Sequence, residues 1–185
     1  MRVRLFEHDD AKLVLSWITS EREFRMWSAD QYDNYPISPE DMLHYYCDKI
    51  SQGPFYPLIF EEKGKPIGHM ILRYPTSDQK LIRLGFIVLD NKKRGKGYGR
   101  QVVLEGMKYA SMNLGAMKFN LGVFTNNYRA IKCYESIGFK SIKVKKNLYK
   151  FHDEEWDMQE MLYDPSVEIV NLAMEHIIKP FKGRV

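Results

Sequence analysis

The chain has 185 residues, of which 44% are hydrophobic and 28% charged, and its formal net charge is +4. This ordinary globular composition predicts a single domain with a sizeable core and at most one appendage. The small basic excess suits an anionic small ligand better than a nucleic-acid duplex, which usually needs a broad basic face.

Cysteine usage argues against a metal-binding or disulfide-rich protein, and hydropathy argues against a membrane protein. The two cysteines, Cys47 and Cys133, show neither metal-ligand spacing nor a disulfide framework, so we expect no metal and a reducing cytoplasm. No apolar run approaches the roughly 20 residues that span a bilayer. Residues 1–7 are too short and too charged for a secretory signal, so we expect no membrane association.

The first half of the chain is predicted to contain one strand, two helices and a hairpin. Asp9 or Asp10 can cap the first helix, and Ser38-Pro39-Glu40-Asp41 is a strong start for the second. Lys63-Gly64-Lys65 is the turn of the hairpin. The predicted elements are a strand at 2–7, helices from 11 to 18 and from 38 to 50, and strands at 56–61 and 66–73.

Residues 20–37 mix charged side chains with aromatic rings. The rings are Phe24, Trp27, Tyr32 and Tyr35. We interpret this segment as a loop or short helix near a binding cleft. The alternative is that the rings only pack on the core, which is the commoner use of aromatic side chains.

The second half alternates strands and helices. The predicted elements are strands at 81–89, 118–124, 139–151 and 155–163 and helices at 97–114 and 126–137. Together with the hairpin, these units predict a mixed α/β sheet.

The last residues look like an appendage. Apolar residues recur at helical spacing over 166–178, so we divide the chain into a domain at 1–164 and a helical extension at 165–185. This helix must be covered either by its own domain or by a second copy in a homodimer, and a terminal appendage favours the homodimer.

A cationic, glycine-rich loop joins the strand at 81–89 to the helix at 97–114. Its core is Arg94-Gly95-Lys96-Gly97-Tyr98-Gly99. This order directs backbone N–H groups and the positive end of a helix at one spot, which suits a phosphate. The spacing matches neither a Walker A loop nor the dinucleotide fingerprint, and by itself an exposed turn with solvated lysines explains it equally well.

The loop resembles the acetyl-CoA loop of the GNAT superfamily of N-acetyltransferases, whose signature is Gln/Arg-x-x-Gly-x-Gly/Ala. A second segment, residues 127–139, is similar to the family pattern Asn-x-x-Ala-x-x-x-Tyr-x-x-x-Gly-Phe. The resemblance covers most of residues 1–163. Residues 5–17 and 25–27 also resemble the branch that includes ribosomal-protein N-terminal acetyltransferases.

This resemblance implies an α/β (α+β) fold. Its centre is a mixed, mostly antiparallel sheet of about seven strands flanked by helices, with a splayed central strand pair. It also implies an acetyl-CoA-dependent acyltransferase. Such an enzyme moves an acetyl group to the primary amine of a small molecule or a protein N-terminus, by direct attack on the thioester in a ternary complex.

Specific residues can serve such a reaction. Backbone N–H groups of the loop and its cations can hold a pyrophosphate; these residues are Arg94, Gly95, Lys96, Gly97, Tyr98 and Gly99. By resemblance, the backbone of Ile87, Val88 and Leu89 pairs with the pantetheine arm. Asn127 can hold that arm, cap a helix, or do both. The phenol of Tyr134, protonated at pH 7, can give a proton to the departing thiolate, unless it is only a packed core tyrosine.

The sequence does not identify a general base. Some members of the family carry a glutamate three residues before the position of Phe86, where this chain has Arg83. Substitutes are Glu23, Asp30, His69, Glu135 or a chain of waters, although His69 is more typical of a satisfied core histidine. Gly85 would either ease a bulge in the central strand or simply pack.

Two other functions remain open at this point. One is a non-catalytic acyl-CoA-binding or sensor domain on the same fold, which Tyr134 argues against and Arg83 mildly supports. The other is a nucleic-acid-binding module that uses the basic loop, but no known reading motif accompanies that loop.

Overall fold

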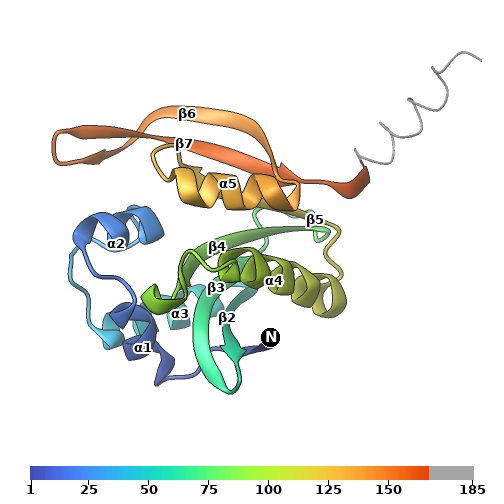
Figure 1. The fold of residues 1–185 in the computed structure, drawn as a ribbon, viewed down its shortest axis with the longest axis horizontal. Helices are drawn as coiled ribbons and strands as arrows, with labels where there is room; N and C mark the ends of the chain where they lie inside the picture. The colour runs from blue at the N-terminus through green and yellow to red at the C-terminus, as the bar shows by residue number, and fades with distance from the viewer. Residues whose placement is uncertain (167–185) are drawn as a thin grey trace, which may run out of the picture.

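The computed structural model describes residues 1–166 (Figure 1). Its strands are β1 (Arg2–Leu5), β2 (Phe55–Glu62), β3 (Lys65–Arg73), β4 (Leu81–Leu89), β5 (Lys118–Phe124), β6 (Lys140–Phe151) and β7 (Glu154–Tyr163). Its helices are α1 (Asp10–Ser16), α2 (Glu21–Ser28), α3 (Pro39–Gln52), α4 (Tyr98–Leu114) and α5 (Tyr128–Ile137), with a 3₁₀ turn, η1 (Asn91–Lys93).

The strands form one seven-stranded sheet in the order β1-β2-β3-β4-β5-β7-β6. Every neighbouring pair is antiparallel except β4 and β5, which are parallel. The prediction of a mixed, mostly antiparallel sheet flanked by helices is confirmed.

Most element boundaries follow from local signals. Ser38 and Asp41 form a reciprocal capping box at the start of α3. Gly115 and Gly138 end α4 and α5 in the left-handed conformation that glycine adopts without penalty. The segment at 20–37 does contain a short helix, α2, capped by the side chain of Ser20.

Two apolar cores lie on opposite faces of the sheet. One face packs against α4 and α5, through residues such as Leu84, Val103 and Phe139. The other packs against α1 and α3, through residues such as Val14 and Met42. Figure 1 shows α4 in front of the sheet and α3 behind it.

The central strand pair diverges, as expected from the resemblance. Parallel pairing joins Leu81, Ile82 and Arg83 of β4 to Lys118, Phe119 and Asn120 of β5 and goes no further. Residues 84–89 of β4 therefore have no partner in β5, while β5 stays paired with β7 up to Phe124. An edge of unpaired backbone groups opens inside the sheet, where another extended chain could pair.

β4 is also bulged beside this opening. Its register against β3 shifts between Ile71↔Gly85 and His69↔Val88, and Phe86 has a φ of 51°. The bulge therefore falls on Phe86 and not on Gly85, whose missing Cβ instead admits the side chain of Ile71 at 3.1 Å. A left-handed phenylalanine costs about 1–3 kcal/mol and persists only when its surroundings hold it.

Two predicted features fall beyond Ser166, outside the described residues. They are the body of the helix at 166–178 and the homodimer contact assigned to it. Within residues 1–166, no helix is both long enough and apolar enough to cross a membrane. No group of three or more metal-ligating side chains is found there either.

Candidate active site

The glycine loop presents open space in front of the first turn of α4. Gly95 and Gly97 have φ values of 74° and 82°, a conformation that favours glycine. Gly97 occupies the N-cap position without a side chain to cap the helix, and an added Cβ there would find nothing within 4 Å. The first N–H groups of α4 therefore remain available for an anion, as a pyrophosphate site requires.

Contacts from several parts of the chain hold the loop in place. The guanidinium of Arg94 donates to Glu23 Oε1 at 2.7 Å, to the carbonyl of Trp17 at 2.6 Å and to the carbonyl of Leu89 at 3.3 Å. Tyr98 donates to Glu62, which also pairs with Lys93 at 2.5 Å. The Arg94 side chain thus connects the loop to the N-terminal helices. Because its guanidinium is already bonded, the backbone N–H groups of the loop are better placed than this side chain to bind an anion.

Two exposed cations lie near the loop backbone. Lys96 donates to the carbonyl of Lys92 at 3.0 Å. Arg129, at the start of α5, brings Nη2 within 3.9 Å of the place where a Cβ of Gly95 would stand. Sequence reasoning missed Arg129 because it occupies a variable position of the second motif. The sequence signal that could have identified Arg129 is its position as a cation in the first turn of α5, the helix that follows α4 in the chain.

Three asparagines surround the divergence of β4 and β5. Asn127 Oδ1 accepts from the backbone N–H of Ala130 at 3.3 Å, so the capping role of Asn127 is confirmed. The buried Oδ1 atoms of Asn120 and Asn126 have no hydrogen-bond partner within residues 1–166. Unmet buried acceptors are uncommon and indicate an absent donor, so these residues and the free edge of β4 fit an amide-bearing chain such as pantetheine.

The bulge at Phe86 is held from the α2 side. The indole N–H of Trp27 donates to the Phe86 carbonyl at 2.8 Å, and the centroids of the two rings lie 4.8 Å apart. Tyr32 and Tyr45 pack against the same ring. The aromatic segment at 20–37 therefore packs on the core, and in doing so it braces the strand that borders the opening.

Tyr134 is buried on α5, with 8% of its surface exposed, and belongs to the core on the α4 and α5 side of the sheet. Burial raises the pKa of its phenol, so the group stays protonated at neutral pH. No hydrogen bond engages its hydroxyl within residues 1–166, so the proton remains available to a ligand.

Among residues 1–166, none of the four side chains considered as a general base is placed to serve as one. His69 is fully buried, with Nδ1 bonded to the Leu58 carbonyl at 2.9 Å and Nε2 to the Tyr46 hydroxyl at 2.7 Å. Glu23 is bound to Arg94 and to Thr19. Asp30 and Glu135 are exposed. His69 is thus the satisfied core histidine that its residue type favours.

The burial of His69 predicts an acid-sensitive fold. Burial lowers its folded-state pKa to about 3, whereas the unfolded chain takes up the proton near pH 6.5. The free energy of unfolding should therefore fall as the pH drops from about 6.5 towards 3, by at most about 1.4 kcal/mol per pH unit from this group. Urea titrations between pH 7 and 4 measure this slope.

A His69→Gln variant is the control for that slope. It should be less stable at pH 7 but should lose less stability on acidification than the parent chain. Equal slopes in the two proteins would mean that other groups cause the acid sensitivity.

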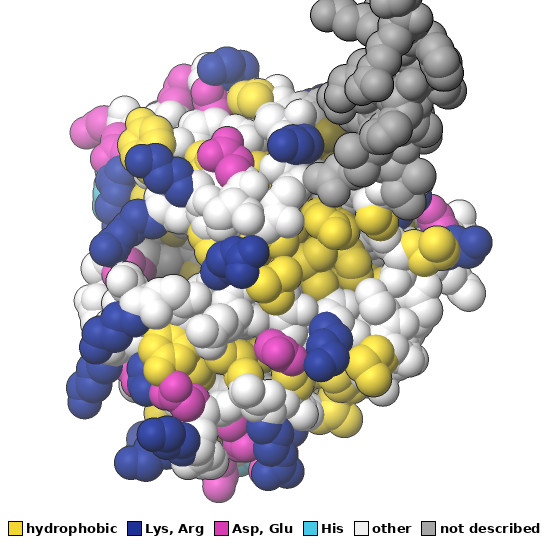
Figure 2. Space-filling view, turned by 45° about the vertical axis from the view of Figure 1, so that its right-hand side comes forward, with side chains coloured by type: hydrophobic (Ala, Val, Ile, Leu, Met, Phe, Trp, Pro, Cys, Tyr) yellow, Lys and Arg dark blue, Asp and Glu magenta, His cyan; other side chains and the backbone are white. Residues whose placement is uncertain are grey.

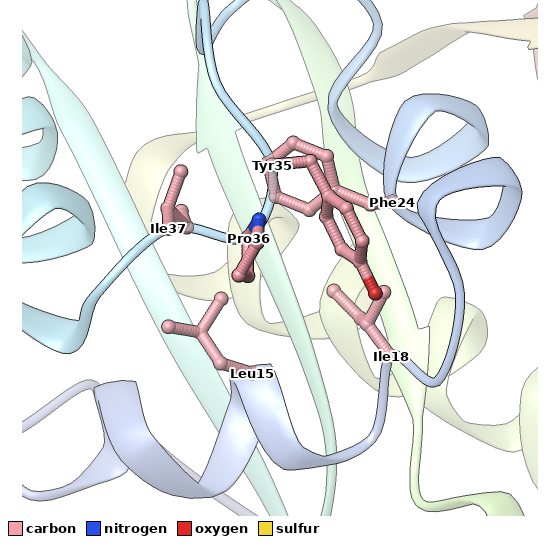
Figure 3. Close-up of a pocket in the computed structure, with 6 residues that line it drawn as sticks. All are labelled: Leu15, Ile18, Phe24, Tyr35, Pro36 and Ile37. Atoms are coloured by element: carbon pink, nitrogen blue, oxygen red, sulfur yellow. The ribbon is translucent and has the colours of Figure 1, made fainter.

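A separate small cavity lies between the end of α1, α2 and the segment before α3 (Figure 3). Its volume is about 70 Å³, and its lining residues are Leu15, Ile18, Phe24, Tyr35, Pro36 and Ile37. Binding sites for drug-sized ligands usually measure about 300–1,000 Å³. The cavity is therefore a packing gap under the aromatic segment.

The comparisons agree with this geometry. The sequence profile of the Acetyltransferase (GNAT) family matches residues 20–139. The chain therefore belongs to the GNAT family of acetyltransferases. An uncharacterized protein of Methanocaldococcus jannaschii is 22% identical over 155 residues, which are 83% of this chain and 30% of that protein. The chain thus spans about a third of the length of this relative.

Solved structures share the fold. A spermidine N-acetyltransferase from Vibrio cholerae, crystallised with CoA and spermine, is 18% identical with a TM-score of 0.74, covering 88% of this chain and 94% of that one. A protein assigned as a phosphinothricin N-acetyltransferase is 23% identical with a TM-score of 0.71, covering 88% and 97%. At these identities the likeness establishes the fold, while the acceptor has to be argued from the residues of this chain.

Proposed function

We propose that this chain transfers the acetyl group of acetyl-CoA to a primary amine by direct attack in a ternary complex. The observation that carries the proposal is the divergence of β4 from β5 beside the open first turn of α4. An extended pantetheine arm suits the free strand edge, and a pyrophosphate suits the helix start. A neighbour of the same fold was crystallised with CoA.

Each part of the site has a role in this proposal. The loop backbone at residues 94–99, with Lys96 and Arg129, holds the pyrophosphate. The backbone of Ile87, Val88 and Leu89 and the side-chain amide of Asn127 align the pantetheine. Acetyl-CoA supplies an activated thioester. The amine nitrogen forms a bond to the carbonyl carbon, the carbon–sulfur bond breaks, the amine loses one proton, and Tyr134 gives one to the departing sulfur.

The amine must lose its proton without a dedicated carboxylate. Because Glu23 and His69 are engaged in the structure, a water chain to solvent is the proposed route, and it suffices for an amine with a moderate pKa. The rate should therefore rise with pH until the acceptor amine is neutral.

Release of the CoA thiol in the presence of an amine panel tests the proposed function. Thiol release that depends on the amine, with the acetylated amine detected by mass spectrometry, is the expected result. Tight acetyl-CoA binding with no transfer to any amine would instead support the sensor alternative, which the presence of Arg83 in place of a glutamate favours.

Binding of nucleic acid has less support. Figure 2 shows Lys and Arg side chains scattered among Asp and Glu over the face in view, without one broad basic field. We expect no sequence-independent affinity for duplex DNA at physiological salt.

A further inference from the structure

Arg83 occupies the point where β4 and β5 part. It is the last residue of β4 that pairs with β5, opposite Asn120. Its Nη2 lies 2.7 Å from the position that a Cβ of Gly122 would take, and Met158 Sδ lies 2.9 Å from the same position. The guanidinium therefore reaches across from β4 and lies over Gly122 of β5, which has room for it only because that residue is glycine.

Arg83 lies on the face of the sheet opposite α4. Its neighbours Ile82 and Leu84 point into the core beneath α4, so by strand alternation Arg83 points towards the α1 and α3 side. Gly122 is exposed there. The guanidinium thus borders an open part of the surface beside the diverging strands, on the side away from the glycine loop helix.

The charge of Arg83 has no counter-charge bonded to it in the part of the chain that the structure describes. Within residues 1–166, no hydrogen bond or ion pair engages its guanidinium. Glu160 pairs with Gly122 in the sheet register, but its carboxylate is bound to Lys145 at 2.8 Å. Burial, which has the largest effect, and the charge of Arg73 both lower the pKa of Arg83. The charge of Glu160 raises this pKa, but its effect is the smallest of the three.

A second cation stands beside it. Arg73 of β3 pairs directly with Arg83 in the register and is exposed. Directly paired residues of neighbouring strands project to the same face of a sheet, so Arg73 lies on the same face as Arg83. Two adjacent guanidinium groups, one of them half-buried and unpaired, attract an anion and repel a polycation.

We propose that the acetyl acceptor of this chain is an amine that also bears a small anionic group, such as a carboxylate, and that Arg83 binds this group with support from Arg73. The inference rests on the proposed acetyl transfer, since it names the substrate class of that same site. The anion would hold the amine at the mouth of the diverging strands. The aromatic rings around Phe86 border the same face and can contact the rest of the acceptor.

Matched amines test the proposal through turnover. Phenylalanine and phenethylamine, and lysine and cadaverine, differ by one carboxylate, and spermidine serves as the polycation. We expect the carboxylate-bearing member of a pair to have a kcat/KM at least about 10-fold higher, as for one charge-assisted contact. Equal values within both pairs, or a preference for spermidine, would overturn the proposal.

Arg83→Gln provides the residue-level test. It should raise KM for the carboxylate-bearing acceptor by about 10- to 100-fold, without raising KM for the partner that lacks the carboxylate and without changing the Kd for acetyl-CoA. Arg83→Lys, which keeps the charge, should recover part of the loss. Arg73→Gln, at an exposed position, is the second variant in case Arg83→Gln does not fold. A KM that responds equally for both members of a pair would show a structural role only.

Calorimetric titration of the CoA-bound protein with the same amines separates this proposal from the proposed function. Tighter binding of the carboxylate-bearing amine, lost in Arg83→Gln, would support the anion site even if no amine were acetylated. If amines were acetylated but the carboxylate-bearing amine bound no more tightly than its partner, the proposed acetyl transfer would be supported and the anion site would be rejected.

Discussion

Replacing Tyr134 with phenylalanine should lower kcat by about 10²- to 10⁴-fold and leave the Kd for acetyl-CoA nearly unchanged, the range expected when a general acid is lost. The phenol is buried and its pKa is raised, so it holds its proton at neutral pH. The departing thiolate is the group that needs a proton, and without the phenol it must leave as an anion or wait for water.

The substitution removes the hydroxyl of Tyr134 and leaves its packing in place. Within residues 1–166, the hydroxyl of Tyr134 makes no hydrogen bond, and the ring packs against Phe139 with centroids 6.0 Å apart. Phenylalanine keeps that ring, so the thermal unfolding midpoint should change little. Single-turnover rates with saturating acetyl-CoA measure the chemical step directly.

Two outcomes would contradict the assignment. If Tyr134→Phe turned over at the parental rate, the sulfur would receive its proton elsewhere, and Tyr134 would be a packing residue. If the variant lost acetyl-CoA binding, the phenol would act on the ligand rather than on the leaving group. Ala130→Gly, on the same helix but without a phenol, is a control for general perturbation of α5.

Replacing Gly97 with aspartate should weaken acetyl-CoA binding by about 100-fold or more. Gly97 is the N-cap of α4, and an added side chain would enter empty space in front of the helix start. A carboxylate at that point would stand where the phosphates are proposed to bind, and two like charges about 4 Å apart at a protein surface repel by a few kcal/mol.

Gly97→Asn is the matched control for this prediction. Asparagine and aspartate have similar size and both tolerate positive φ better than other residues, so the backbone strain at 82° is nearly the same in the two variants. The difference between their acetyl-CoA Kd values, measured by calorimetry, then isolates the charge. If the two variants bound equally, or if Gly97→Asp bound like the parent chain, the pyrophosphate would not lie at the start of α4.

Local chemistry made much of the fold predictable from the sequence. The β4 strand, the Lys63-Gly64 turn and the Ser38 cap all follow from residue preferences within a few positions. The two family motifs, at residues 94–99 and 127–139, led to the family and to the divergent strand pair. The capping role of Asn127 was also visible, because a helix start needs an acceptor there.

Tertiary structure decided which partners the key side chains have. It bound Arg94 to Glu23 and Trp17, enclosed both nitrogens of His69, moved the bulge to Phe86 and laid Arg83 over Gly122. These contacts join residues that are far apart in the chain. They depend on strand register and on which face each strand buries, and a short window of sequence contains neither. The sequence by itself thus determined the elements and the class of chemistry, while packing between distant segments decided which charges are already paired and which are left for a ligand.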